Sequence, residues 1–278
     1  MNLGIVADEI ERDFGRALRV GTSLGLRRYE IRFLKSGRAP MCDPRELLEV
    51  EHQAREEGVE ITALSPGLFK HVSDAAGFKQ EMNELYPRVI EWAKRWKLSG
   101  LIVFGFEKPG ATEENGDLVS SRNPPAEVLE WITQAGDRAR TDGIQLMIEP
   151  EPVCWADTWT ATSALIRRAG IPSLQINDDP GNVAWMERRD SVDEFKPIAS
   201  LIANVHVKDL KWAAPGSGKP KFVPAGEGMI DYRYHFAVLQ QASYQGPISL
   251  EPHMDGSVET IRRCKRAFED LWNSATCG

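Results

Sequence analysis

The chain has 278 residues, of which 42% are hydrophobic and 27% are charged, and this composition is ordinary for a soluble globular protein with a sizeable core. Its formal net charge is −7 and its pI is about 5.4. This acidic balance argues against a protein built to hold nucleic acid, because such proteins usually present a broad basic face.

The chain alternates between short apolar runs, which predict strands, and longer segments, which predict helices. Strands are expected at 3–7, 29–34, 59–64, 100–106, 144–148, 174–177, 203–207 and 247–250. Helices are expected after the first strand, with Phe14, Leu18 and Leu24 toward one face, and at 43–58, 76–97, 124–143, 158–169, 191–202, 231–246 and 257–272. Two polar segments, 107–123 and 208–228, are expected to be long loops.

Capping residues mark the ends of several predicted helices. Asp43 precedes Pro44, which places an aspartate at the N-cap and a proline in the first turn. Gly58 provides a stop for the same helix. Asp231 is the expected N-cap of the helix that begins after the second long loop.

Eight strand–helix alternations of this length predict an α/β protein, a (β/α)8 TIM barrel in which residues 1–278 form a single domain. The strands are continuous apolar runs rather than alternating patterns, as expected for parallel strands that are covered on both faces. A doubly wound open sheet is the alternative. It is disfavoured because no Gly-x-Gly-x-x-Gly follows the first strand. We find no internal repeat beyond the strand–helix period and no interdomain linker.

Compartment and membrane signals point to a cytoplasmic protein. The first residues contain no basic segment followed by a long apolar one, so we expect no signal peptide, and no run approaches the length of a membrane span. Cys42, Cys154, Cys264 and Cys277 lie far apart and form no Cys-x-x-Cys, which indicates reduced thiols.

The last four predicted strands each end in a residue that binds divalent metals. Glu149, Asp179, His206 and Glu251 follow the fifth, sixth, seventh and eighth strands. Adjacent strand ends lie about 4.8 Å apart, and barrel enzymes place their chemistry at the carboxyl ends of the strands, so these side chains can converge. Three carboxylates and one imidazole suit Mn²⁺, Mg²⁺, Co²⁺ or Zn²⁺, and the oxygen majority favours Mn²⁺ or Mg²⁺.

Each of these residues has a simpler interpretation, because an acidic residue after a strand is often a solvated loop residue or a helix N-cap. Asp179 in particular opens Asp-Pro-Gly-Asn, which is a good Asx-turn. Asp178 is an alternative to Asp179 as the sixth-strand ligand. The recurrence at four successive strand ends, with one of only five histidines among them, favours the metal site.

Several pieces of the chain together resemble the sugar phosphate isomerase/epimerase family, the xylose isomerase-like barrel group that also includes endonuclease IV. The pieces are Ile-Glu149-Pro-Glu-Pro, Asp179-Pro-Gly-Asn182, Val-His206-Val-Lys208-Asp209, Gly226-Glu-Gly228-Met-Ile-Asp231 and Leu-Glu251-Pro. The resemblance implies a (β/α)8 barrel, substrates that are keto sugars or cyclitols, often a dimer or tetramer, and one divalent metal ion, for which the oxygen-rich donor set puts manganese in first place. Its metal ligands would be Glu149, Asp179, His206 and Glu251.

Asn182 departs from the family pattern, in which this position is usually a histidine that contacts the substrate. An asparagine donates and accepts hydrogen bonds but does not titrate near neutral pH. The substrate therefore does not follow from the resemblance.

The function implied by the resemblance is a sugar, sugar-phosphate or cyclitol isomerase or epimerase. A base would remove the proton next to a carbonyl while the metal stabilises the enediolate, and Glu149 and Glu251 would be the acid/base pair. Further candidates for substrate contact are Arg32, Glu151, Trp155, Asn182 and Lys208. Arg32 shares a strand face with Glu30, and a surface ion pair between the two is the alternative.

Three other functions compete with this one. A lyase on the same scaffold, such as an inosose or dehydroshikimate-type dehydratase or a C-glycoside-cleaving enzyme, would share the first proton abstraction. An endonuclease IV-like nuclease needs several more histidines than this chain offers at its strand ends. A non-catalytic sugar-binding barrel would require the four ligands to be incidental. We expect a small-molecule sugar or cyclitol partner, with neither nucleic acid nor membrane.

Overall fold

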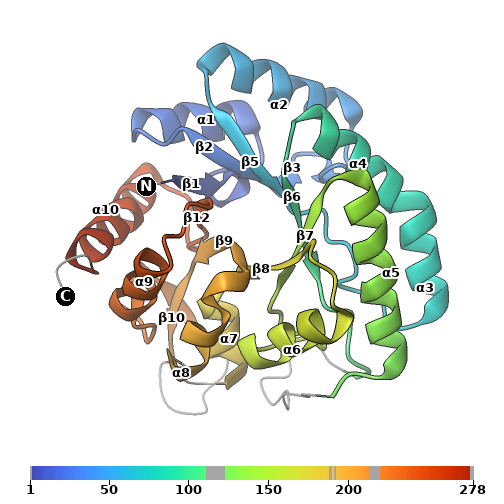
Figure 1. The fold of residues 1–278 in the computed structure, drawn as a ribbon. Coiled ribbons are helices and arrows are strands. Elements are labelled where there is room, and N and C mark those ends of the chain that lie inside the picture. The colour runs from blue at the N-terminus through green and yellow to red at the C-terminus, as the bar shows by residue number, and fades with distance from the viewer. Residues whose placement is uncertain (1, 111–122, 188–189, 191, 213–219, 276–278) are drawn as a thin grey trace.

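The computed structural model is a closed barrel of eight parallel strands with helices around it (Figure 1). It describes residues 2–110, 123–187, 190, 192–212 and 220–275. The barrel strands are β1 (Leu3–Val6), β2 (Arg28–Ile31), β5 (Glu60–Leu64), β6 (Gly100–Phe104), β7 (Gln145–Glu149), β8 (Leu174–Asp178), β9 (Ile202–Val207) and β12 (Ile248–Leu250). They pair in this order around the barrel, and β12 closes it against β1. The predicted (β/α)8 TIM barrel is confirmed.

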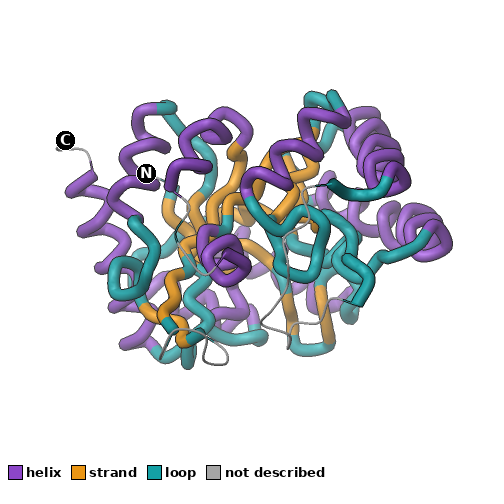
Figure 2. Tube along the Cα trace, turned by 90° about the horizontal axis from the view of Figure 1, so that it is seen from below, coloured by secondary structure: helices purple, strands orange, loops and turns teal. Residues whose placement is uncertain are grey.

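The helices form an outer layer over the strands (Figure 2). They are α1 (Phe14–Ser23), α2 (Pro44–Glu57), α3 (Ala75–Gln80), α4 (Tyr86–Arg95), α5 (Ala126–Asp142), α6 (Trp159–Ala169), α7 (Pro180–Glu187), α8 (Val192–Phe195), α9 (Tyr232–Gln241) and α10 (Val258–Ala275). Short 3₁₀ turns lie at η1 (Ala7–Glu9) and η3 (Lys196–Leu201), and a π-helical turn lies at η2 (Glu81–Leu85). Within the described residues, none of these helices is long and apolar enough to cross a membrane.

The predicted capping residues take the expected roles. The Asp43 carboxylate accepts the Arg45 N–H at 2.9 Å, and Pro44 lies in the first turn of α2. Gly58 ends that helix in the left-handed conformation, with φ of 62°. The Asp231 carboxylate accepts the Tyr234 N–H at 3.1 Å at the start of α9. Local sequence therefore fixes where these elements begin and end.

Three predicted elements are divided in the structure, and one of them is the helix expected at 191–202, which contains α8 followed by the 3₁₀ turn η3. The strand expected at 29–34 ends at Ile31, and β3 (Phe33–Leu34) turns back as a hairpin against β4 (Gly37–Arg38). The helix expected at 76–97 is split into α3 and α4 by the π-turn η2. Apolar periodicity does not register an added residue in a helical turn, so the sequence pattern continues across the break.

Three further elements were not predicted. Residues 208–228, expected to be a loop, contain the antiparallel pair β10 (Asp209–Lys211) and β11 (Lys221–Val223). Residues 180–187, which follow an expected turn, form α7. The Asp179 carboxylate accepts the Asn182 N–H at 2.9 Å, and Pro180 lies in the first turn. Aspartate followed by proline suits a helix start as well as an Asx-turn.

The barrel interior is apolar at one level and polar at another. Ala63, Ile102 and Met147 form a small apolar cluster separate from the large core between strands and helices. Four polar side chains from β2, β8 and β9 are also buried in the structure, namely Glu30, Asn177, Asn204 and His206. Buried polar groups require partners. We therefore expect a functional site beside this polar layer, at the carboxyl ends of the strands.

Candidate active site

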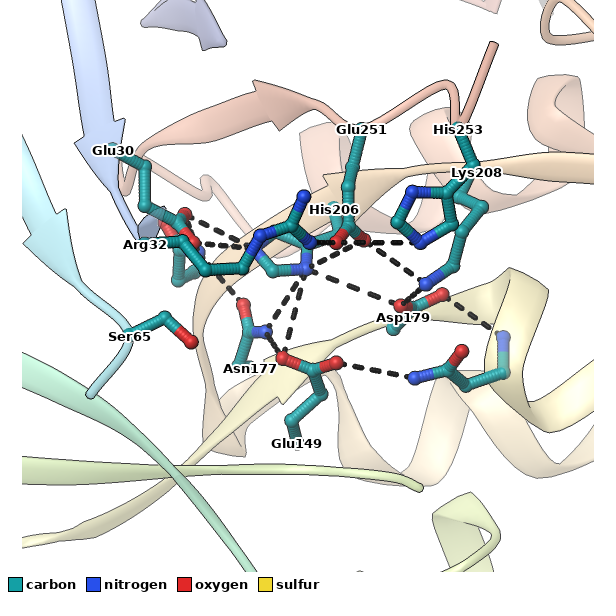
Figure 3. A network of polar contacts seen from close by, with 12 residues as sticks. Glu30, Arg32, Ser65, Glu149, Asn177, Asp179, His206, Lys208, Glu251 and His253 are labelled. Atoms are coloured by element: carbon teal, nitrogen blue, oxygen red, sulfur yellow. Dashed lines mark hydrogen bonds and ion pairs between the residues drawn. The ribbon is translucent and has the colours of Figure 1, made fainter. Parts of the chain in front are cut away.

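A cavity of about 510 Å³ opens among the carboxyl-end residues of the barrel strands. Its lining includes Glu149, Asn182, His206, Lys208 and Glu251, which the sequence analysis singled out separately. Glu149 is the last residue of β7, His206 lies on β9, and Glu251 follows β12. Figure 3 shows these side chains converging in one polar network.

The four predicted metal ligands lie close together. Ligand atoms of Glu149, Asp179 and His206 are all within 4.8 Å of one another. Glu251 Oε2 lies 3.1 Å from His206 Nδ1. Glu149 and Glu251 approach His206 from opposite sides (Figure 3), because they come from the two outer members of the strand series β7, β8, β9 and β12.

Asp179, rather than Asp178, faces this cluster. Asp179 Oδ2 lies 2.5 Å from Lys208 Nζ and 3.9 Å from His206 Nδ1. Asp178 instead accepts the Trp159 indole N–H at 2.7 Å, and burial raises its pKa to about 7. Successive residues at a strand end point to opposite faces, so only one of the two aspartates can reach the barrel axis.

A buried carboxylate holds the imidazole of His206. Glu30 lies 3.0 Å from His206 Nε2, and both side chains are almost completely buried. This contact leaves Nδ1 directed toward Glu149, Asp179 and Glu251. A carboxylate on the far nitrogen is the usual way in which proteins orient a metal-binding histidine. The sequence places Glu30 on the same strand face as Arg32. Its contact with His206 runs across the barrel from β2 to β9, so the sequence pattern does not reveal it.

Two amides position Glu149. Asn177 Nδ2 donates to Glu149 Oε2 at 2.9 Å, and Asn182 Nδ2 donates to Glu149 Oε1 at 3.1 Å. Asn182 also donates to the Pro150 carbonyl at 2.9 Å. Asn182, predicted as a substrate-binding residue, lines the cavity and at the same time fixes the orientation of a candidate acid/base carboxylate.

Cations surround Glu251. Lys208 Nζ lies 3.0 Å from Glu251 Oε2 and also contacts Asp179, while Arg32 Nη1 donates to Glu251 Oε1. Arg32 further pairs with Asp8 and Glu9 at 2.9 and 2.6 Å, so it forms a buried network rather than a surface pair with Glu30.

Lys208 reaches the site because it follows His206 by two residues and therefore faces the same way. Helix α7 packs closely against this position. A Cβ at Gly181 would lie 2.6 Å from the Lys208 carbonyl oxygen, so a larger residue would force the two segments apart.

His253 lies beside Glu251 and was not predicted to be part of the site. Its Nδ1 is 2.8 Å from Glu9 Oε1, and its Nε2 is 3.7 Å from Glu251 Oε1. Its side chain is 32% exposed and lines the cavity. Glu9 was missed as well, because an acidic residue just after the first strand carries no signal of its own.

Glu149 and Glu251 have opposite electrostatic environments. Burial raises the pKa of Glu149 to about 7. Burial also opposes ionisation of Glu251, but Lys208, His206, His253 and Arg32 outweigh it and hold the pKa well below the ordinary value. Burial acts against the charged form of His206, yet Glu30 and Glu251 raise its pKa well above the ordinary value. Paired groups with separated pKa values are typical of acid/base sites.

The raised pKa of Glu149 predicts a pH-dependent stability difference in the metal-free protein. Between the ordinary value of 4.5 and about 7, the folded state retains a proton that the unfolded state releases, so stability falls as the pH rises. Glu149→Gln removes this cost and is expected to stabilise the metal-free protein by about 1–3 kcal/mol at pH 8, with no such gain at pH 4.5. Urea unfolding at both pH values measures the difference.

Glu151→Gln is the matched control, because Glu151 follows Glu149 by two residues, just after β7, and is paired with Lys70 at 3.3 Å. The change in the free energy of unfolding caused by Glu151→Gln should not show the same pH dependence. If Glu149→Gln changed the free energy of unfolding equally at the two pH values, the raised pKa of Glu149 would not be the cause of the change.

The remaining predicted residues are divided between the cavity and the core. Glu151 lines the cavity together with Trp185 and Phe222, whose ring centroids lie 6.1 Å apart. Trp155 is absent from the cavity lining, and it packs against the core. Its backbone N–H donates to the Phe106 carbonyl at 2.8 Å.

The donor set fits a divalent cation. It offers three carboxylates and one imidazole within a few ångströms, and the imidazole has a carboxylate on its other nitrogen. The Lys208 ammonium, 2.5 Å from Asp179 and 3.0 Å from Glu251, indicates that these oxygens attract positive charge. Binding of a divalent metal would release the proton that these carboxylates favour on His206.

Comparison with known proteins places the chain in a family. A family model described as xylose isomerase-like TIM barrel matches residues 18–270. The chain is 36% identical over 80 residues to L-ribulose-5-phosphate 3-epimerase UlaE of Escherichia coli, which is 29% of this chain and 26% of UlaE. The match thus spans about a quarter of that relative's length.

Two solved structures share the whole barrel. The IOLI protein with a binding zinc atom has a TM-score of 0.79 and 15% identity, with all of both chains covered. The probable 3-DHS dehydratase AsbF from Bacillus anthracis has a TM-score of 0.75 and 18% identity, over 97% of this chain and 99% of that one. At these identities the likeness establishes the fold.

Proposed function

Because the chain belongs to the xylose isomerase-like TIM barrel family, we propose that it is a divalent-metal-dependent isomerase or epimerase of a keto sugar, a sugar phosphate or a keto cyclitol. The observation that carries this proposal is the pair of buried carboxylates, Glu149 and Glu251, on opposite sides of His206. The similarity of part of the chain to an epimerase supports the same reaction class.

In this proposal Glu149, Asp179, His206 and Glu251 hold the metal. When bound, a divalent metal would supply Lewis-acid polarisation of the substrate carbonyl. Manganese is our first choice because three of the four ligands are carboxylates.

The chain's own residues move the proton. Glu251, kept ionised by Lys208 and Arg32, takes the proton from the carbon next to the carbonyl, and the electron pair of that C–H bond moves toward the carbonyl oxygen. Glu149 returns a proton to the opposite face, which inverts that carbon. The roles exchange in the reverse direction. Asn177 and Asn182 hold Glu149 in place throughout.

Exchange of the carbon-bound proton with solvent tests this function. Protein stripped with a chelator and reloaded with Mn²⁺, Mg²⁺, Co²⁺ or Zn²⁺ is incubated in D2O with a panel of ketoses, ketose phosphates and keto cyclitols. We expect metal-dependent deuterium incorporation next to the carbonyl of at least one substrate, with conservation of the carbon skeleton and its oxygens. Absence of both metal uptake and exchange would refute the proposal and favour a non-catalytic barrel.

A lyase is the second candidate, and His253 is the observation that favours it. This side chain lies on the Glu251 side of the cavity and is oriented by Glu9. After removal of the proton next to the carbonyl, protonation of a β-hydroxyl by His253 would release water and leave a carbon–carbon double bond. The fold is shared with a probable dehydratase. In the D2O assay this reaction is distinguished by a product that has lost the mass of water.

A further inference from the structure

Arg38 presents unused hydrogen-bond donors in the cavity. It lies on β4 and lines the cavity, although it belongs to none of the barrel strands. Two of its five N–H groups donate to Ser65, one to the carbonyl oxygen and one to the hydroxyl, each at 3.0 Å. The others have no acceptor within the described part of the chain. Burial and the neighbouring Arg32 lower the pKa of Arg38, which reflects a guanidinium without a close counter-ion.

Three other cations of the cavity lining, Arg32, Lys208 and Lys70, are better matched. Arg32 pairs with Asp8, Glu9 and Glu251. Lys208 contacts Asp179 and Glu251, and Lys70 lies 3.3 Å from Glu151. Arg38 makes no ion pair with a carboxylate among the residues that the structure describes. The half-buried guanidinium thus lies in the cavity wall without a carboxylate beside it, and an anionic ligand would supply that partner.

The surroundings hold the guanidinium in one position. Its Cζ lies 5.1 Å from the ring centroid of Phe33 and 5.8 Å from that of Phe104. A Cβ on Gly67 would approach Arg38 Nε to 2.9 Å, so this glycine leaves the space in which the guanidinium lies. Fixed by Ser65 and two aromatic rings, Arg38 is preorganised for a planar, bidentate partner.

We propose that Arg38 binds an anionic group of the substrate, a carboxylate or a phosphate, at the end of the molecule away from the reacting carbonyl. This inference rests on the proposed function, and it narrows the substrate to anionic keto sugars or keto cyclitols. Lys70 Nζ lies 5.4 Å from the same Phe104 ring, so the charged group enters a region with two cations. Phe104 is in register with Glu149 across β6 and β7, which places the anion on the Glu149 side of the cavity.

The experiment compares matched ligands on matched variants. Binding of L-ribulose, L-ribulose 5-phosphate and 3-dehydroshikimate is measured by calorimetry on chelator-treated protein, in which the metal-dependent reaction does not proceed and Glu251 keeps its contacts with Arg32 and Lys208. We expect at least one anionic ligand to bind ~10- to 100-fold more tightly than the neutral ketose. Arg38→Met should abolish this preference and leave binding of the neutral ketose within about threefold. The phosphate and the carboxylate arms identify which anion the site takes.

Arg12→Met is the matched control. Arg12 lies 4.8 Å from the ring centroid of Phe33, but it is exposed at the cavity mouth. If Arg12→Met weakened anion binding as much as Arg38→Met, a general positive potential would explain the preference and the proposed contact would be wrong. Equal affinity of neutral and anionic ligands for the parent protein would also overturn it. Arg38→Lys retains the positive charge and should keep part of the preference for anionic ligands. This variant therefore distinguishes the loss of a direct contact in Arg38→Met from a failure of that variant to fold.

The two proposals fail in different ways. Solvent deuterium exchange in protein with an intact Glu251 tests the chemistry, whereas the ratio of anionic to neutral affinity tests Arg38. Metal-dependent deuterium exchange observed only with neutral ketoses would support the isomerase proposal and contradict the proposed anion site at Arg38. Selective anion binding without metal uptake or deuterium exchange would support the anion site and contradict the isomerase proposal.

Discussion

Glu149→Gln is expected to lower turnover of the true substrate by roughly a hundred- to ten-thousandfold, because proton transfer by a positioned carboxylate contributes on the order of 10²–10⁴ and glutamine cannot exchange a proton. The amide retains the size of the side chain and can still contact Asn177 and Asn182, which donate to the carboxylate at 2.9 and 3.1 Å. Steady-state kinetics at saturating metal measure the loss.

The proposed positions of Glu149 and Glu251 on opposite faces of the substrate allow a second test. Exchange between substrate and solvent should survive partly in Glu149→Gln for the epimer whose proton faces Glu251, since that carboxylate is intact. Glu251→Gln should show the complementary pattern with the other epimer. Glu151→Gln is the control, because this carboxylate lines the same cavity but pairs with Lys70. Near-normal turnover of Glu149→Gln would show that the acid/base assignment is wrong.

Lys208→Met is expected to destabilise the metal-free protein by about 3–5 kcal/mol, the cost of leaving buried carboxylates without their partner. Lys208 Nζ lies 2.5 Å from Asp179 and 3.0 Å from Glu251, and all three side chains are buried. A divalent metal supplies positive charge at the same oxygens, so saturating Mn²⁺ should recover most of the loss. Urea unfolding with chelator and with Mn²⁺ measures both values.

Lys108→Met provides the matched control for this prediction. Lys108 and Asp157 form a buried ion pair at 2.7 Å, and neither belongs to the four proposed ligands. Its loss should destabilise the protein without recovery by metal. If Mn²⁺ failed to reduce the penalty of Lys208→Met below that of the control, Lys208 would not share its carboxylates with the metal.

The convergence of the four proposed ligands was accessible from the sequence because chain order alone places strand ends side by side in a barrel. Glu149, Asp179, His206 and Glu251 stand at such ends, and the structure brings their side chains together. The choice between Asp178 and Asp179 depends on the direction of one side chain. That direction follows from the position of Trp159, which accommodates Asp178 outside the barrel.

The supporting residues were less accessible because their roles come from contacts across the barrel. Glu30 meets His206 from β2, and Glu9 meets His253 from η1. No local pattern connects residues so distant in the chain. Arg38 escaped notice for another reason, since it lies beyond the strand expected at 29–34, on a hairpin that the sequence pattern did not predict. A break in strand periodicity carries no information about where the side chains beyond it will point.

Helix α7 illustrates ambiguity in local signals. Asp179, Pro180 and Asn182 satisfy the rules for an Asx-turn and for a helix start equally well. The helix prevails in the structure, where it brings Asn182 over Glu149 and Gly181 against Lys208. Both contacts depend on neighbouring strands, which a local pattern does not include.

The amide at position 182 has a consequence for how the protein responds to acidity. A histidine there would gain a charge as the solution becomes acidic, and its hold on Glu149 would change with it. Asn182 donates to Glu149 and to the Pro150 carbonyl at any pH in the physiological range. A pH–rate profile of this protein is therefore expected to contain one ionisation fewer than that of a relative with histidine at this position.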